Sequence, residues 1–276
     1  PTCPRMVVIP PGRFAMGSWG GEVERYEGPV RNVTIDYTFA VGQYEITNDQ
    51  FAEFIAATGH TPADYCNLLF VDELEVRTVP GMNWRDPRYG RPPAGDEPVV
   101  CVRQTDALAY TQWLAAQTGK DYRLLTEAEW EYTALAGSDF AFPWGPDLES
   151  ACAHGNVYDQ SALDERLPIP APNCDDGSPG VSPVGQYQPN AFGVYDMVGN
   201  VWEWLSDCYV VPYPDEPTDG SAVMRAGCER WVSKGGSWRS SILRQRPAFR
   251  GRDPADLSTQ IFGFRVARSL GEPDPS

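Results

Sequence analysis

Short apolar runs open the chain and predict strands rather than helices. Met6–Ile9 is apolar and stops at two prolines, and Arg13–Met16 is a second short run that stops at a Gly-Ser pair. From Val33 to Tyr44, apolar residues alternate with polar ones, which is the period of a strand with one buried face. We therefore expect three strands within the first 44 residues.

Threonines followed by Gln or Glu three residues later predict the starts of helices. Thr47 with Gln50 and Thr126 with Glu129 have the spacing of a capping box, in which two backbone donors are satisfied reciprocally. A glycine after the apolar residues of each predicted helix marks the expected C-terminal end of that helix. The expected helices run from Thr47 to Gly59, from Thr105 to Gly119 and from Thr126 to Gly137.

Between these helices the periodicity is weak. Residues 60–98 are rich in proline and predict a long irregular segment, followed by a strand at Pro98–Val102. The chain becomes irregular again from about Gly145 to Val184, and no linker or repeat divides it. We expect one α+β domain over residues 1–276, with three short helices, short strands and many loops.

Composition narrows the class of partner. The chain has a formal net charge of -16, so it lacks the basic surface that neutralises phosphates, and we expect no nucleic-acid partner. No apolar run approaches the roughly 20 residues that span a bilayer. The protein should therefore act on a small molecule or a peptide.

The cysteines indicate an oxidising compartment. Seven are scattered along the chain without a CxxC pair, which favours disulfides over a zinc site. Cys152 with Cys174 and Cys208 with Cys228 are the preferred pairs because each closes a short loop, although the sequence leaves the connectivity open. The chain starts PTCPRM, without a signal segment, so we expect a matured, exported form.

Cations gather in one late stretch of this acidic chain. Gly235-Gly236 precedes Ser237 and Trp238, and arginines follow at positions 239, 244, 246, 250 and 252. A glycine pair lets the backbone turn tightly, and clustered arginines suit a pocket for an anionic ligand. The alternative is that each arginine pairs with a carboxylate and holds an irregular loop in place.

Motifs in this order resemble one known family. They are MVVIPPGRFAMGS, YEITNDQFAEF, RLLTEAEWEY, FPWG, NAFGVYDMVGNVWEW, KGGSW and GFRVA, and they span Met6 to Ala267. The pattern resembles the formylglycine-generating (sulfatase-modifying factor) enzymes. The resemblance implies a variant of the C-type lectin fold.

The resemblance also implies two structural calcium sites. The first maps onto the side chains of Asp196 and Glu203 with the carbonyls of Gly199 and Val201. Carboxylate and carbonyl oxygens are what this hard cation prefers, although a capped turn with Glu203 paired to an arginine is the alternative. The second site maps onto four residues of two loops: Asn156, Val157, Asp176 and Ser178.

The family's copper chemistry is not expected here. Its oxidases use two cysteines after the Gly-Gly-Ser motif, and those positions are Ser240 and Gln245. Neither side chain supplies the thiolate that Cu(I) prefers. We therefore expect no copper and no formylglycine-generating activity.

Other cofactors lack a motif. There is no GxGxxG or P-loop, so no flavin or nicotinamide is expected, and His60 and His154 lie too far apart in sequence to suggest an iron site. The catalytic group stays unassigned. A substrate pocket is expected from Ser237, Trp238, Arg239, Ser240, Arg244, Gln245 and Arg250.

Three functions are compatible with this pattern. The cysteine count and lost copper cysteines resemble a periplasmic family member that matures a siderophore chromophore, which implies oxidation of dihydropyoverdine to pyoverdine without a tightly bound cofactor. The alternatives are a non-catalytic, lectin-like binding module and an inactive partner of a sulfatase-modifying enzyme. A deep cleft would favour an enzyme, and a shallow one a binding module.

Overall fold

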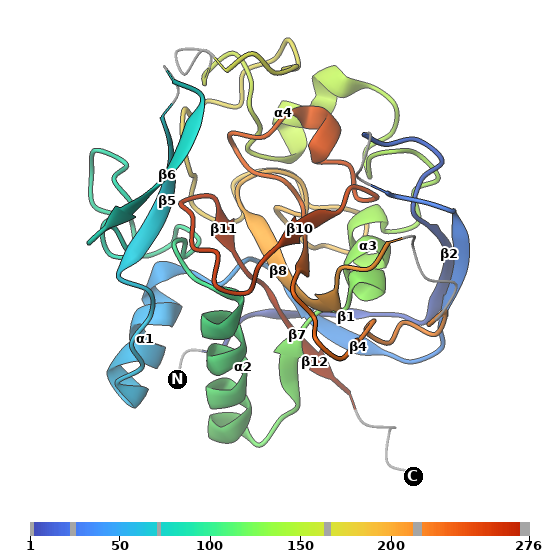
Figure 1. Cartoon of the computed structure of the whole chain (residues 1–276). Coiled ribbons are helices and arrows are strands. Elements are labelled where there is room, and N and C mark those ends of the chain that lie inside the picture. The colour runs from blue at the N-terminus through green and yellow to red at the C-terminus, as the bar shows by residue number, and fades with distance from the viewer. Residues whose placement is uncertain (1–2, 23–25, 71–72, 163–166, 212–216, 271–276) are drawn as a thin grey trace.

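The computed structural model describes residues 3–22, 26–70, 73–162, 167–211 and 217–270. Two four-stranded sheets form its centre (Figure 1). The first sheet is antiparallel and joins both ends of the chain, because the last strand pairs with strands from the beginning and the middle. Its strands, in spatial order, are β1 (Met6–Ile9), β4 (Phe39–Gly42), β12 (Val266–Ser269) and β7 (Tyr122–Leu124).

The second sheet holds the stretch that carries the Gly-Gly-Ser motif. Its strands, in order, are β10 (Gly251–Asp253), β9 (Trp231–Lys234), β8 (Trp202–Cys208) and β11 (Phe262–Gly263). Strand β11 runs parallel to β8, and the other pairs are antiparallel. Strand β9 delivers Gly235 directly after its last residue, Lys234, so the sheet fixes where the motif begins.

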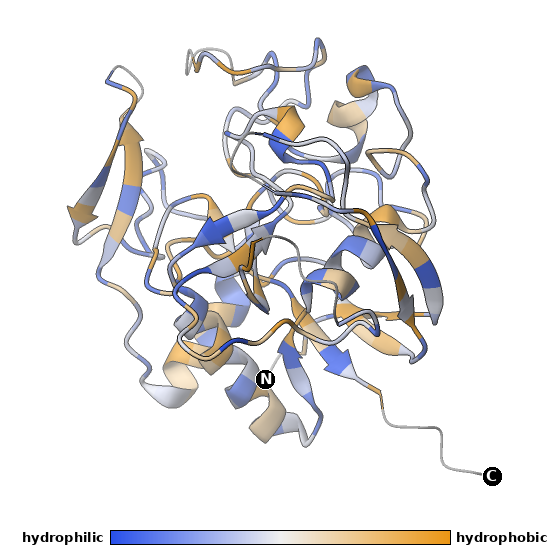
Figure 2. Ribbon diagram, turned by 45° about the vertical axis from the view of Figure 1, so that its right-hand side comes forward, coloured by the Kyte–Doolittle hydropathy of each residue, from blue (hydrophilic) through white to orange (hydrophobic). Residues whose placement is uncertain are grey.

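Two hairpins flank the sheets. One pairs β2 (Gly12–Met16) with β3 (Arg31–Ile35), and the other pairs β5 (Tyr65–Phe70) with β6 (Glu75–Pro80). The second hairpin stands out from the body in both views (Figures 1 and 2). A parallel bridge between Asn67 and Thr259 links it to the chain ahead of β11.

The three predicted helices are present. They are α1 (Asn48–Thr58), α2 (Gln104–Thr118) and α3 (Glu127–Leu135), and a short α4 (Ala151–His154) follows the 3-10 turn Leu148–Ser150. Thr47 and Thr126 form the predicted capping boxes. Helices α1 and α2 lie side by side (Figure 1), and none of the described helices is long and apolar enough to cross a membrane.

Four local predictions are wrong. The expected single strand from Val33 to Tyr44 is split between β3 and β4, which belong to different sheets. Helix α2 begins at Gln104 with Arg103 as N-cap, because Asp106 accepts from the backbone N–H of Arg103. The segment 60–98 contains the β5–β6 hairpin. Pro98–Val102 is buried but forms an isolated bridge, from Pro98 to Thr47, in place of a strand, and Cys101 has a left-handed φ of 56°.

Apolar side chains pack into two main clusters, one around α3 and one around α1 and α2. Trp130 and Phe39 lie in the first, and Phe51, Tyr110 and Phe264 lie in the second. Full burial of one such side chain contributes about 1.5–3 kcal/mol to the free energy of unfolding. These clusters hold the sheets in place beneath the loops that form the candidate site.

Disulfides tie the loop regions together. Both preferred pairs are present, Cys152–Cys174 and Cys208–Cys228, and the structure adds Cys66–Cys101. Cys3 is free and exposed, which accounts for the odd count. The Cys66–Cys101 disulfide links the base of the β5–β6 hairpin to the segment before α2. It therefore holds the hairpin, which forms one wall of the candidate site described below, against the body of the protein.

Candidate functional site

The Gly-Gly-Ser motif forms a tight turn that only glycine fits well. Gly235 and Gly236 have φ values of 95° and 75°, in the left-handed region. A Cβ on Gly236 would lie 2.3 Å from the Cγ of Gln245, so a larger residue would push that side chain away. The turn also brings the N–H of Trp238 onto the carbonyl of Asn200, at 3.1 Å. The motif is therefore packed against the loop that precedes β8.

Ser240 and Gln245, at the positions of the family's copper cysteines, contact each other inside the protein. The amide nitrogen of Gln245 donates to the carbonyls of Ser240 (2.8 Å) and Ser237 (3.1 Å). The hydroxyl of Ser240 accepts from the indole N–H of Trp202 at 3.0 Å and lies 2.9 Å from the hydroxyl of Ser237. A hydroxyl and an amide are hard ligands and do not fit a soft copper ion.

Two of the predicted pocket arginines lie elsewhere. Arg250 is fully buried and pairs with Glu127 through two hydrogen bonds of 2.7 and 3.0 Å. Arg244 pairs with Glu22 at the surface. Both pairs are of the kind that the alternative interpretation describes, in which an arginine bound to a carboxylate holds the loop in place. Ser237, Ser240 and Gln245 lie beneath the site rather than in its wall.

Trp238 and Arg239 do line a cavity, of about 640 Å³. Its walls come from segments far apart in the chain: strand β5, the loop 88–97, residues 178–186 and the turn after β9. The wall residues divide into an apolar and a cationic group. The apolar group includes Leu68, Leu69, Phe70 and Val181, and the cationic group comprises Arg88, Arg91 and Arg239.

Hydrogen bonds fix the polar wall. Arg91 forms a double ion pair with Glu97, which also accepts from the N–H of Ala94 at 2.8 Å. The hydroxyl of Tyr89 donates to the carbonyl of Gln260 at 2.7 Å. When the amide of Gln260 is oriented to donate to Pro87, its oxygen accepts from Arg239 at 2.7 Å. Glu97 is the carboxylate within this wall, as far as the described residues extend.

Sequence reasoning missed the residues of this wall that precede α2. Tyr89, Arg91 and Glu97 lie in a stretch expected to be irregular, and the β5 residues lie in an unrecognised hairpin. The sequence RYGRPP, two arginines around an aromatic residue and a glycine, is the signal that could have indicated them. Their distance in sequence from the Gly-Gly-Ser motif hid the connection.

At the first predicted calcium site, Glu203 is engaged by protein groups. Arg265 donates to both of its oxygens, at 2.8–3.2 Å, and Trp130 donates to Oε2 at 2.8 Å, which is the arginine-paired alternative. Asp196 nevertheless keeps its buried Oδ1 without a hydrogen-bond partner within the described chain, and burial raises the pKa of Asp196 to about 6. An ionised oxygen in this position suits a cation, and the carbonyls of Gly199 and Val201 lie in the same turn.

The second predicted site has the same kind of vacant acceptor. The Oδ1 of Asn156 is buried and has no partner among described groups. Asp176 accepts from the N–H groups of Val157 and Ser178, both at 2.8 Å, and burial raises its pKa to about 7. Asp176 thus contacts the backbone of the two loops that carry Val157 and Ser178, and amide, carboxylate and carbonyl oxygens are ligand types that fit calcium, so this site stays a prediction. Nearby, Cys152 and Cys174 form a disulfide and offer no thiolate.

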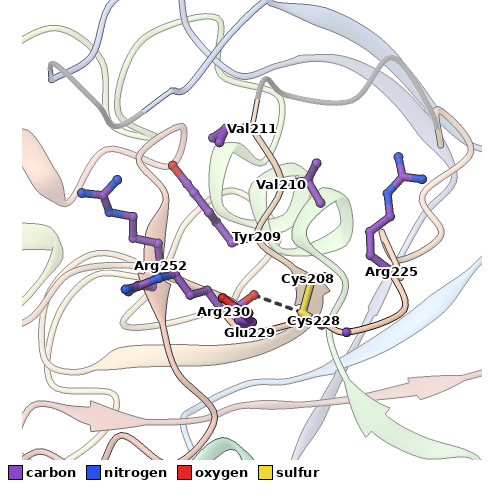
Figure 3. Close-up of a pocket in the computed structure, with 10 residues that line it drawn as sticks. Cys208, Tyr209, Val210, Val211, Arg225, Cys228, Glu229, Arg230 and Arg252 are labelled. Carbon is purple, nitrogen blue, oxygen red and sulfur yellow. Dashed lines mark hydrogen bonds between the residues drawn. A yellow bond between two sulfur atoms is a disulfide. The ribbon is translucent and has the colours of Figure 1, made fainter.

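A second cavity, of about 600 Å³, lies beside the Cys208–Cys228 disulfide (Figure 3). Figure 3 shows Arg225 and Arg252 on opposite sides of it and Tyr209 between them. None of the seven predicted substrate residues lines it. The cavity beside Trp238 is therefore the one that the motif analysis supports.

The fold and this site place the chain in a known family. The sequence model of the sulfatase-modifying factor enzyme 1-like domain matches residues 1–270, and the chain belongs to this family. The mouse formylglycine-generating enzyme is 35% identical over 95% of this chain and 74% of its own length. Mouse inactive C-alpha-formylglycine-generating enzyme 2 is 31% identical over 98% of this chain and 87% of its own.

A solved structure is similar to this chain over nearly its whole length. It is PvdO from Pseudomonas aeruginosa, which is 37% identical and superposes with a TM-score of 0.81 over 97% of this chain and 95% of PvdO. The expected α+β fold of the formylglycine-generating enzymes is thereby confirmed.

Proposed function

We propose that this protein has a PvdO-like role and oxidises a dihydroquinoline siderophore chromophore, dihydropyoverdine, to its aromatic form. The observation that carries the proposal is the cavity beside Trp238, which lies next to copper positions that are filled by Ser240 and Gln245. The similarity to PvdO supports the same role. Closed packing at the copper positions argues against formylglycine-generating chemistry on this chain.

The reaction balances with dioxygen as oxidant. Aromatisation removes two electrons and two protons from the dihydro ring, and dioxygen takes up both to give hydrogen peroxide. The protein's contribution is to bind the ring against the aromatic and apolar wall and to accept a proton. Glu97 is the lining carboxylate that can take that proton, held in place by Arg91 and the N–H of Ala94.

The environment proposed for the reaction is extracytoplasmic. Three disulfides in a chain of 276 residues are typical of an exported protein. A periplasmic location would also give the protein access to an exported siderophore precursor. The role proposed for calcium at the Asn156 and Asp176 loops is structural: it would hold in place the segment that carries Ser178, which lines the cavity.

The experiment is an aerobic assay of the purified protein with dihydropyoverdine. Absorbance of the aromatic product and hydrogen peroxide should rise together, in a one-to-one ratio, faster than in buffer. Glu97→Gln should reduce the rate about 100-fold, the usual scale of a lost proton acceptor. Arg244→Ala, which removes a surface charge, is the matched control. No acceleration by folded protein would overturn the proposal.

A second candidate is an inactive partner of a sulfatase-modifying enzyme. The similarity to the mouse inactive enzyme 2 favours it, as does the replacement of both copper cysteines. It predicts stable association with a formylglycine-generating enzyme or a sulfatase in a defined binding assay. Activity on dihydropyoverdine with no such association would exclude it.

A further inference from the structure

We propose that Arg88 recognises an anionic oxygen of the ligand in the cavity beside Trp238, and that the ligand is a flat aromatic molecule with an acidic hydroxyl group. The inference rests on the function proposed for this cavity, and it names the part of the substrate that one residue contacts. Three features of the structure support it: the backbone of Arg88, the charges around it, and the apolar residues that line the same cavity.

The backbone at Arg88 has a conformation that arginine rarely adopts. Its φ is 57°, in the left-handed region where a side chain crowds the backbone and glycine is favoured. The N–H of Arg88 donates to the carboxylate of Asp86 at 3.2 Å, which holds the turn. Residues strained in this way cluster at binding and catalytic sites, so the φ of Arg88 agrees with a function for its side chain in the cavity.

Of the three arginines that line the cavity among the described residues, Arg88 is the one whose charge is available to a ligand. Arg91 is paired with Glu97, and Arg239 donates to Gln260. Within the described part of the chain, no carboxylate forms an ion pair with Arg88, although this side chain lines the cavity. An anionic oxygen bound there would receive charge-assisted hydrogen bonds, which are the stronger kind.

The apolar part of the lining selects the body of the ligand. Leu68, Leu69 and Phe70 of β5 line the cavity together with Pro179 and Val181, and Trp238 adds a flat ring. A planar aromatic molecule would bury its faces against these groups, while a hydroxyl at its edge would reach the cationic side. A catechol fused to a nitrogen heterocycle combines both properties.

The test uses two probes of nearly equal shape, 6,7-dihydroxyquinoline and quinoline, in calorimetric titrations of the full chain. The wild-type protein should bind the dihydroxy probe more tightly, and the absorbance of that probe should show ionisation at a lower pH when bound. Arg88→Gly should weaken binding of the dihydroxy probe by about tenfold or more and abolish the absorbance shift, since a charged hydrogen bond is lost. Binding of quinoline should not change.

The Arg88→Gly variant distinguishes an effect on ligand binding from an effect on folding. Because glycine adopts a φ of 57° without strain, Arg88→Gly should keep or raise the melting temperature while it weakens binding. Arg85→Gln is the matched control, since Arg85 lies in the same loop but stacks on Trp84, at 4.2 Å, outside the cavity wall. It should bind both probes as the wild type does.

Several outcomes would overturn the inference. They are a fall in melting temperature with Arg88→Gly, equal weakening of both probes, an Arg85→Gln variant as weak as Arg88→Gly, or no binding of the dihydroxy probe by the wild type. The proposed function fails separately. If the dihydroxy probe binds tightly through Arg88 but dihydropyoverdine is not oxidised, the inference about Arg88 holds and the proposed function fails. If Arg88→Gly oxidises dihydropyoverdine at an unchanged KM, the proposed function holds and the inference about Arg88 fails.

Discussion

Two arginines that follow the Gly-Gly-Ser motif each pair with a carboxylate, but their burial makes the contributions to stability very different. Arg250 is fully buried against Glu127, with Lys234 3.4 Å from the same carboxylate. Removing one partner of a buried pair typically costs about 3–5 kcal/mol, and without Arg250 the Glu127 carboxylate would keep only a share of Lys234, which lies closer to Glu131. A surface pair such as Arg244 with Glu22 contributes only about 0–1 kcal/mol.

We therefore expect Arg250→Ala to lower the free energy of unfolding by about 3–5 kcal/mol. Arg244→Ala, the matched surface control, should change it by less than about 1 kcal/mol. Urea denaturation followed by circular dichroism measures both. Folded Arg250→Ala protein should still bind 6,7-dihydroxyquinoline normally. A stable variant with lost binding would mean that Arg250 contacts the ligand after all.

Asp207 gives a prediction for pH. Burial, followed by the nearby charge of Glu127, raises the pKa of Asp207 from the ordinary value of 3.8 to about 7. The folded state then binds the proton more tightly than the unfolded state, so this group stabilises the fold at low pH and loses that contribution as pH rises towards 7.

Asp207→Asn removes this titration. The variant also loses an acceptor for the backbone N–H of Glu127 or Val223, which costs about 1–2 kcal/mol where Asp207 is protonated. The deficit relative to wild type should be largest near pH 5 and should shrink by pH 8. Urea titrations of both proteins across this range test it. A deficit that grows with pH would show that Asp207 is ionised and stabilising in the folded protein.

At the scale of elements, capping chemistry was predictable and long-range pairing was not. Thr47 and Thr126 fix their helices through contacts within four residues, so a local pattern was sufficient. The split between β3 and β4 depends on pairing with β2 and β1, and no local pattern encodes which partner a strand chooses. The cavity was only half predicted for the same reason: Trp238 belongs to a motif, but Tyr89 reaches it through tertiary packing.

The β5–β6 hairpin depends on its anchors more than on its own packing. The described anchors include the Cys66–Cys101 disulfide, the bond from Asn67 N–H to the carbonyl of Ser258 and the bond from the Tyr65 hydroxyl to Asp256. Further out, Val76 is 63% exposed, so little apolar burial holds that part. The disulfide therefore secures the wall that carries Leu69 and Phe70.

Replacing Cys66 and Cys101 by alanine should lower the free energy of unfolding by about 2–4 kcal/mol. Hydrogen exchange should accelerate in β5 and β6 more than in α2, because these strands lose their anchor while α2 keeps its packing. Affinity for quinoline, which depends on the apolar wall, should fall. Uniform acceleration across both regions would mean that the disulfide stabilises the whole fold rather than the hairpin.

At the scale of the whole molecule, buried polar side chains link the second predicted calcium loop, at Asn156, to Asn200 in the first and to Glu45. The amide of Asn156 donates to Asn200, at 3.2 Å, and Asn200 donates to Glu45, at 3.1 Å. Burial and the neighbouring Asp196 raise the pKa of Glu45. Oxygens of Asn156, Asp196 and Glu45 remain without partners within the described residues, so the interior has more acceptors than donors along this line.

A bound cation would relieve that imbalance and so stabilise the fold. Calcium at 100 times its dissociation constant should add about 2.7 kcal/mol per site to the free energy of unfolding, and a chelator should remove this contribution. Metal analysis of the purified protein and thermal unfolding with and without chelator measure the effect. Asn156→Ala should abolish the part due to the second site, whereas Asn67→Ala, in the hairpin, should not. Equal melting temperatures with excess calcium and with chelator would instead mean that the acceptors are satisfied by protons or water, and that Arg265 alone balances Glu203.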